Sequence, residues 1–244
     1  AIEPSAGTVD EISWDAKAIH DHVRALGPSG EGIAGELARD FATWRTTWIA
    51  AKRGACLANR ANELPTASYE RTLGCISRAR AAFTATTGVV RAATRDRLVD
   101  VVLAARGLPD VAQCRVYGET STVAPPPHDI ASHVDAVAAE VERARVLALA
   151  SQPDAVEASA LAETAARSLG YAPLVAQALL ARGNALLAQH DKPRAIATLD
   201  AAAVAALAVG DQRTAVEALA RELFAIARAL DVDSPIARGA DATI

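Results

Sequence analysis

The stretch ALLARGNALLAQHDKPRAIATLDAA, residues 178–202, decides the fold of this chain. Each half of it is built from helix-forming residues, and Asp191-Lys192-Pro193 interrupts them because proline cannot continue a helix. Small alanines stand where two helices must approach closely, and leucines stand where the space between helices needs filling. The stretch therefore predicts a pair of packed helices.

The helix pair is predicted to repeat along the second half of the chain. From His133 to Leu230 nearly every residue is a helix former, and a shift of 40 residues superimposes Gly170 on Gly210. Alanines match by chance in a chain that is roughly one quarter alanine, so the glycines and the breaks carry the argument. Neither helix pair can bury its apolar face alone, so the pairs are expected to stack into a right-handed array.

Composition excludes several classes of protein. The chain has 244 residues, of which 51% are hydrophobic and only 4% aromatic, which disfavours β-sheet. A net charge of -4 without a basic cluster gives no sign of nucleic-acid binding. No apolar run is long enough to span a bilayer, so no membrane contact is expected within these residues. Because the chain starts at Ala1 and contains no methionine, we expect it to be a fragment of a longer protein.

The first half predicts a helical hairpin. A short helix is expected from Asp15 to Leu26, and apolar residues at steps of three or four predict a long helix over residues 31–61. Pro65 ends that helix, and Thr66 or Ser68 is expected to cap the next one. The next helix is expected to carry Leu73, Ile76, Ala79 and Phe83 on one face, and a further helix is expected over residues 93–105. Two tryptophans of the long helix, Trp44 and Trp48, are expected either in the core or in an aromatic ridge for a partner.

The repeat half resembles the tetratricopeptide family. Gly183 and Leu186 match the family's small and large residues in a first helix, and Ala195, Leu199 and Ala202 match those of a second helix. The family's aromatic positions hold leucine here, its terminal proline is missing, and the period is longer than usual. The resemblance covers roughly residues 135–230 and implies an α-solenoid.

The first half carries a narrower resemblance, to the region after the kinase domain in myxobacterial, eukaryotic-like serine/threonine protein kinases. It rests on three groups of residues: Trp44, Arg45, Trp48, Arg53, Ala55 and Cys56; Ser68, Leu73, Cys75, Ile76 and Arg78; Leu108, Pro109 and Cys114. In that family a membrane helix often separates the kinase domain from this region. The resemblance implies an extracytoplasmic location, with a cytoplasmic one as the alternative.

Together these observations predict an all-α protein with a helical-hairpin module followed by a tetratricopeptide-like solenoid. The predicted organisation is a flexible tail (1–13), a helical module (14–120), a proline-rich linker (121–132), about 2.5 repeat units (133–232) and a second tail (233–244). The linker prediction rests on three consecutive prolines, which favour a stiff extended chain.

The predicted function is non-catalytic. The Gly-rich loop, the HRD-type catalytic loop and the DFG motif of a kinase are all missing from the sequence. We expect a sensor or scaffold region of a membrane-associated serine/threonine kinase, with a protein or peptide ligand and a possible homodimer. The alternative is a free-standing intracellular scaffold. A small α-helical enzyme would need a convergent polar pocket, which the sequence does not show.

The ligand is expected in the concave groove that first helices of such repeats line. In the tetratricopeptide family an Asn directly after the small glycine can bind a peptide backbone or terminal carboxylate, and here that residue is Asn184. The alternative is a solvated side chain. The expected groove residues are Gln177, Leu180, Asn184, Leu187, Glu217, Arg221 and Phe224.

The three cysteines suggest a disulfide. If the hairpin turns at Pro65, Cys56 and Cys75 lie at equal distances from the turn and are predicted to face each other across neighbouring helices. The alternative is two buried free thiols, and Cys114 is left over in either case. No CxxC motif or paired histidine accompanies the cysteines, so neither a metal nor a cofactor is expected.

Overall fold

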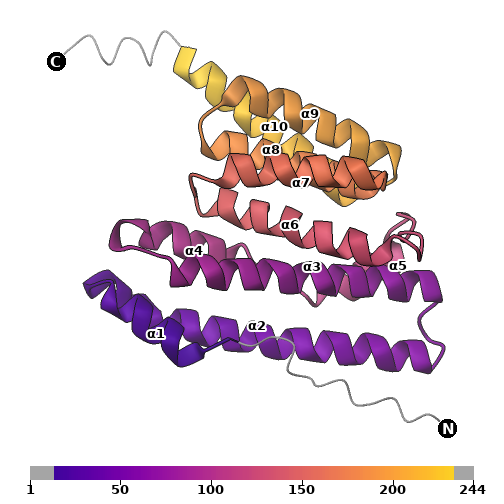
Figure 1. Ribbon diagram of the computed structural model, residues 1–244, viewed down its shortest axis with the longest axis horizontal. Coiled ribbons are helices and arrows are strands. Elements are labelled where there is room, and N and C mark those ends of the chain that lie inside the picture. The colour runs from indigo at the N-terminus through magenta and orange to yellow at the C-terminus, as the bar shows by residue number, and fades with distance from the viewer. Residues whose placement is uncertain (1–13, 234–244) are drawn as a thin grey trace. The chain divides into compact units, whose positions relative to one another are not determined.

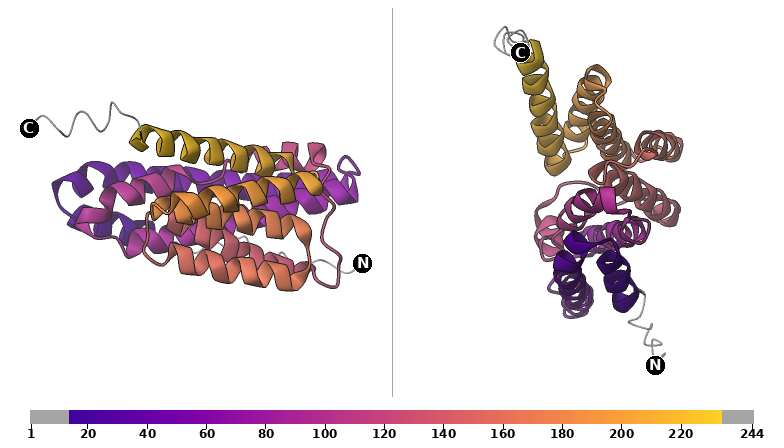
Figure 2. Two further views of the ribbon diagram at one scale, coloured as in Figure 1. Left: turned by 90° about the horizontal axis from the view of Figure 1, so that it is seen from above. Right: turned by 90° about the vertical axis from the view of Figure 1, so that its left-hand side faces the viewer.

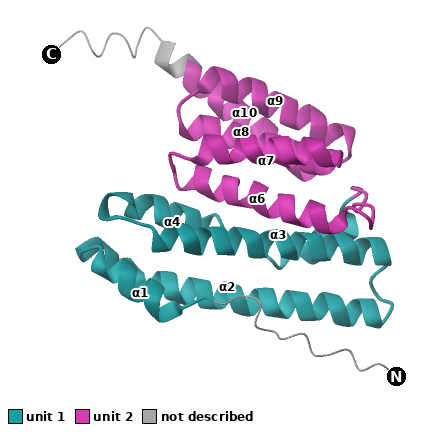
Figure 3. Ribbon diagram, viewed as in Figure 1, with its two compact units in different colours: residues 1–121 teal, residues 122–244 magenta. Residues whose placement is uncertain are grey.

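The computed structural model describes residues 14–233, with the backbone alone for residues 230–233. Over these residues the chain forms ten α-helices, one short 3₁₀ turn and no strand, which confirms the all-α class (Figure 1). The chain divides into two compact units after Ser121 (Figure 3). The predicted tails, residues 1–13 and 233–244, lie outside the described residues except for Asp233, which ends the last helix.

Unit 1 is a set of helices around a long hairpin. Its elements are α1 (Ala16–Ala25), α2 (Pro28–Arg60), α3 (Thr66–Arg91), the 3₁₀ turn η1 (Arg95–Arg97), α4 (Leu98–Arg106) and α5 (Gln113–Thr120). Asp15 caps α1 by accepting a hydrogen bond from the Ala18 amide at 2.9 Å. The predicted cap of the next helix is wrong, because Pro65 takes that position and α3 begins at Thr66.

The tryptophans of α2 belong to the core of unit 1. Trp44 stacks on Phe83 of α3 with ring centroids 4.6 Å apart, and its Nε1 donates to the Pro109 carbonyl at 2.9 Å. Trp48 is buried, and its Nε1 donates to the Ile76 carbonyl at 3.0 Å. Of the two expectations for these residues, the structure therefore supports core packing.

The predicted disulfide between Cys56 and Cys75 is wrong, because Cys75 is bonded to Cys114. The hairpin turns at Asn62, whose φ is 56°, rather than at Pro65. Cys56 consequently lies opposite Tyr69, with 3.6 Å between Sγ and the phenol oxygen. In the same register, the residue of α2 that faces Cys75 lies about two helical turns from Cys56, which is roughly 10 Å along the helix axis. The bond instead fastens α5 to α3.

Unit 2 consists of α6 (Ala131–Leu149), α7 (Ala155–Leu169), α8 (Ala172–Ala188), α9 (Lys192–Ala208) and α10 (Gln212–Asp233). The breaks fall where the sequence predicts them. Gly170 and Gly210 both have left-handed backbones, with φ of 68° and 72°. Asp191 caps α9, and prolines stand in the first turns of α8 and α9, where a missing amide proton costs nothing.

Successive helices of unit 2 stack in order. α7 packs against both α6 and α8, and α9 packs against both α8 and α10 (Figure 2). One close approach is at Gly183 of α8, where an added Cβ would lie 2.5 Å from Cδ2 of Leu199 on α9. Buried alanines of α8, α9 and α10, such as Ala176, Ala206 and Ala215, also let these helices lie close together.

The proline-rich segment is attached to unit 2. Residues 122–127 have no regular structure, and the Thr122 hydroxyl donates to the Gly210 carbonyl at 3.3 Å. The Tyr171 hydroxyl donates to the Ala124 carbonyl at 2.6 Å. These contacts hold the segment, which the sequence predicts to be a stiff extended linker, along unit 2.

Candidate functional site

The predicted groove residues come from two helices that occupy equivalent places in the repeat. α8 and α10 each begin two residues after a left-handed glycine, so residues 40 apart correspond. Gln177 therefore corresponds to Glu217, and Asn184 corresponds to Phe224. Parallel helices of neighbouring repeats place corresponding residues side by side. We call the surface formed by these four residues the α8–α10 face.

Asn184 is the most informative residue of the α8–α10 face. Its Oδ1 is buried and accepts no hydrogen bond from the residues that the structure describes, although Asn184 as a whole is partly exposed. Buried polar atoms are nearly always paired, so an acceptor without a partner needs a reason. Because the oxygen is buried while the residue is partly exposed, it can accept a hydrogen bond from an outside N–H donor once the Asn184 side chain turns outward.

Gln177 has a partner within unit 2. Its Nε2 donates to Oδ2 of Asp211 at 3.3 Å. Asp211 in turn caps α10, because it accepts hydrogen bonds from the amide and the hydroxyl of Thr214 at 3.2 and 2.7 Å. Gln177 thus helps to hold α10 beside α8, whereas Asn184 has a buried acceptor without a partner among the described residues.

A charged pair on α6 lies within electrostatic reach of Glu217. Nε of Arg145 donates to Glu142 at 2.7 Å, and both side chains are largely buried. Burial acts to lower the pKa of Arg145, but the carboxylates of Glu142 and Glu217 outweigh it and raise that pKa above its usual value. Arg145 is therefore always charged, and it adds α6 to the polar surroundings of the α8–α10 face.

The other predicted groove residues lie in different environments. Leu180 is buried in a cluster with Leu199, so its side chain belongs to the core beneath the α8–α10 face rather than to its surface. Leu187 packs partly against the same cluster. Phe224 is half exposed and Arg221 is exposed. The residue of α10 that corresponds to Leu180 is Ala220, so Arg221 does not correspond to it.

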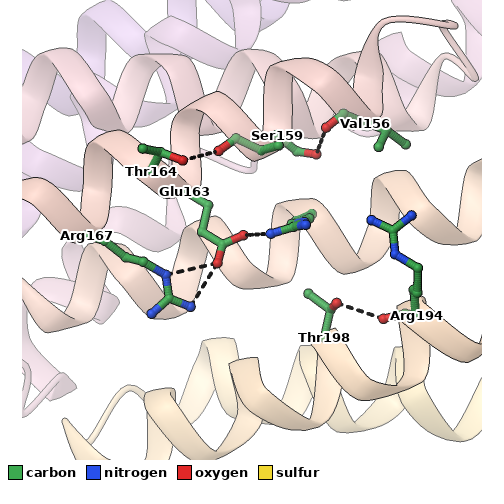
Figure 4. A network of polar contacts seen from close by, with 9 residues as sticks. Val156, Ser159, Glu163, Thr164, Arg167, Arg194 and Thr198 are labelled. Atoms are coloured by element: carbon green, nitrogen blue, oxygen red, sulfur yellow. Dashed lines mark hydrogen bonds and ion pairs between the residues drawn. The ribbon is translucent and has the colours of Figure 1, made fainter.

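A second ionic group, which the sequence analysis missed, links α7 to α8. Glu163 is nearly buried; it accepts hydrogen bonds from Nε and Nη2 of Arg167 at 3.0 and 2.8 Å, and it also pairs with Arg182 (Figure 4). Burial alone would raise the pKa of Glu163, but the hydrogen bonds and charges of the two arginines lower it below its ordinary value. Nε of Arg182 is buried without a partner.

Local spacing could have identified part of these groups. Glu142 and Arg145 are three residues apart and Glu163 and Arg167 are four apart, which are the separations of helical ion pairs. Their burial, and the contact with Arg182 of another helix, depend on how the helices pack. No sequence pattern distinguishes these carboxylates from the solvated ones on the same helices.

Three further findings concern membrane-spanning helices, metal sites and known proteins. Among the helices described, none has the length and apolar character needed to cross a membrane. Within residues 14–233, no group of three His, Cys, Asp or Glu side chains is arranged to hold a metal ion. Comparison with protein-family models, curated proteins and solved structures gives no match to this chain.

Proposed function

We propose that unit 2 binds an extended peptide or protein segment across the α8–α10 face, and that the chain is a non-catalytic sensor or scaffold region. The observation that carries the proposal is the buried, unpartnered Oδ1 of Asn184. A backbone N–H of a bound peptide is a suitable donor for it, because extended peptides present such groups at regular intervals.

The surroundings of Asn184 support a peptide rather than a small charged ligand. Phe224 offers an apolar surface at the corresponding place on α10, and Glu217 offers a carboxylate. Mixed apolar and polar groups along neighbouring helices suit a chain that crosses several helices.

The proposed parent protein is a membrane-associated bacterial serine/threonine kinase, on the resemblance described above. The Cys75–Cys114 disulfide is compatible with the extracytoplasmic side of such a kinase, because structural disulfides persist in oxidising compartments. A free-standing intracellular scaffold is the second candidate. The coding sequence before Ala1 distinguishes them: the kinase proposal requires a kinase domain and a membrane helix there, and it fails if neither is encoded.

Peptide binding can be tested without knowing the natural ligand. A phage library of random peptides is selected on the immobilised 244-residue chain, and a synthetic copy of the enriched peptide is titrated by calorimetry. Asn184→Ala should raise the Kd at least about tenfold, because a hydrogen bond to a buried group is lost. Circular dichroism checks that the variant is folded.

Thr164→Ala provides the matched control. Thr164 is exposed on α7, and its hydroxyl donates only to the Ala160 carbonyl of its own helix, at 2.9 Å. The control should bind the selected peptide as tightly as the unaltered chain. Failure to enrich any peptide, or equal affinity of the Asn184→Ala variant, would contradict the proposal.

A further inference from the structure

One face of α10 exposes apolar side chains that no helix of unit 2 covers. Val216 and Leu223 are each 66% exposed, Phe224 is 53% exposed and Leu219 is 41% exposed. α10 packs against α9 and α8 through its other side, where Ala218 and Ala225 are buried. A solenoid keeps such apolar faces covered by stacking the next helix on them.

The corresponding face of α8 is covered by α9. Forty residues before Val216 and Leu219 stand Ala176 and Leu179, which are almost completely buried. Forty residues before Leu223 stands Gly183, against which Leu199 of α9 packs directly. The exposed face of α10 is therefore the place where a further helix packs in the preceding repeat.

A copy of α9 does not fit on α10. The large side chain of Leu199 reaches α8 because Gly183 leaves room for it. On α10 the equivalent residue, Leu223, fills that space with a side chain of its own. The helix that covers α10 must instead present a small residue opposite Leu223.

α10 itself meets this requirement. Val216, Ala220, Leu223 and Ala227 recur at steps of four and three, so they form one stripe in which large and small residues alternate. Ala220 and Ala227 are exposed like their neighbours. When two such stripes run antiparallel, the large residues of one helix lie over the small residues of the other.

We propose that the chain forms a symmetric dimer in which the α10 helices of two copies pack antiparallel. In this register Leu223 of each copy lies over Ala220 of the other, and Val216 lies over Ala227. The close approach that alanine allows brings the two backbones together, as in the contacts within unit 2. A two-fold axis makes the contact self-complementary and closes the assembly at two copies.

The charges beside the stripe favour the same arrangement. Glu217, Arg221 and Arg228 lie along one edge of the stripe, with Glu217 and Arg228 near its two ends and Arg221 between them. Antiparallel packing brings Glu217 of one copy near Arg228 of the other. In parallel packing the edges that carry these residues lie on opposite sides of the contact, so the pair of Glu217 and Arg228 cannot form.

The oligomeric state of the 244-residue chain tests the proposal. Sedimentation equilibrium should give a dimer for the unaltered chain. Leu223→Glu should raise the dimer Kd roughly a hundredfold, because two carboxylates lose their hydration in the contact. Leu161→Glu is the control: Leu161 is 65% exposed on α7, and its substitution should leave the dimer unchanged.

A pair of size-swapping variants tests the register. Ala220→Leu places leucine against leucine and should weaken the dimer about tenfold, although the substitution makes the surface more apolar. Adding Leu223→Ala to it restores a small residue opposite a large one and should recover most of the affinity. Parallel packing or unspecific association predicts the opposite, namely tighter binding by Ala220→Leu.

Three outcomes would overturn the proposal. The first is an unaltered chain that stays monomeric over the accessible concentrations. The second is a dimer that Leu223→Glu does not weaken, and the third is a dimer that Ala220→Leu strengthens. Each variant alters only an exposed position, and circular dichroism verifies that it has kept its helices.

Discussion

Replacing Gly183 by alanine should destabilise the protein, although alanine is the better helix former. A Cβ at this position would lie 2.5 Å from Cδ2 and 2.6 Å from Cγ of Leu199. Two carbon atoms that are not bonded to each other cannot come this close unless one of them shifts. Leu199 is completely buried, so it has little room to move away. Overpacking costs about 1–3 kcal/mol, and alanine regains about 1 kcal/mol of helix propensity. We expect a net loss of up to about 2 kcal/mol.

Gly54→Ala is the matched control with the opposite sign. Gly54 lies inside α2, is exposed, and has nothing within 4 Å of the position that a Cβ would take. Only the helix-propensity term then applies, so this variant should gain about 0.5–1 kcal/mol of stability. The two substitutions are chemically identical and differ only in what the new methyl group meets.

Urea unfolding followed by two probes can separate these effects. Far-UV circular dichroism reports on both units, whereas tryptophan emission reports on unit 1, which holds Trp14, Trp44 and Trp48. Gly183→Ala should lower the midpoint seen by circular dichroism, and Gly54→Ala should raise the midpoint seen by emission. In a chain that also carries Leu199→Ala, the substitution at Gly183 should become stabilising. Stabilisation by Gly183→Ala in the unaltered chain would refute the packing argument.

Two further predictions concern the disulfide and the buried carboxylate. Denatured, unreduced protein should show one reactive thiol, at Cys56, by alkylation and mass spectrometry, and three thiols would contradict the bond. Cys114→Ser removes a bond between residues 39 apart in the sequence and should lower the free energy of unfolding in urea by up to about 4 kcal/mol. The control Cys56→Ser should leave that free energy unchanged. Glu163→Gln should cost about 1.5–3 kcal/mol at pH 7, because charged hydrogen bonds from Arg167 and Arg182 are lost. The pKa of Glu163 in the folded chain is lowered from 4.5, so its carboxylate stabilises the fold fully above pH 4.5 and loses this effect as the pH falls below that value. The decrease in Tm caused by Glu163→Gln should therefore be smaller at pH 3 than at pH 7. An equal decrease at the two pH values would count against the ion pair.

The class of fold and the helix breaks could be predicted from local chemistry. Gly170 and Gly210 end helices because glycine adopts the left-handed backbone without strain, and Pro193 starts one because its first turn needs no amide proton. These effects involve neighbouring residues only. A single sequence therefore contains all the information that they require.

The disulfide shows where local chemistry is insufficient. The prediction placed the turn of the hairpin at Pro65, whereas the chain turns at Asn62, and a shift of this size changes which residues face each other. The partner of Cys75 lies on α5, whose position depends on packing against α3. Loop geometry and long-range packing together decided the bond, and neither has a signature in the spacing of cysteines.

The candidate site, like the disulfide, could be predicted from the sequence only in part. Asn184 could be singled out because it follows the glycine of the repeat, but its unpaired oxygen is visible only once the neighbouring helices surround it. The exposed stripe on α10 has the same apolar spacing as a buried one. By itself, the sequence determined that the chain forms helices, where they break and which face of each is apolar. Only the tertiary structure decided which of those faces is covered, because burial depends on contacts between residues far apart in the chain.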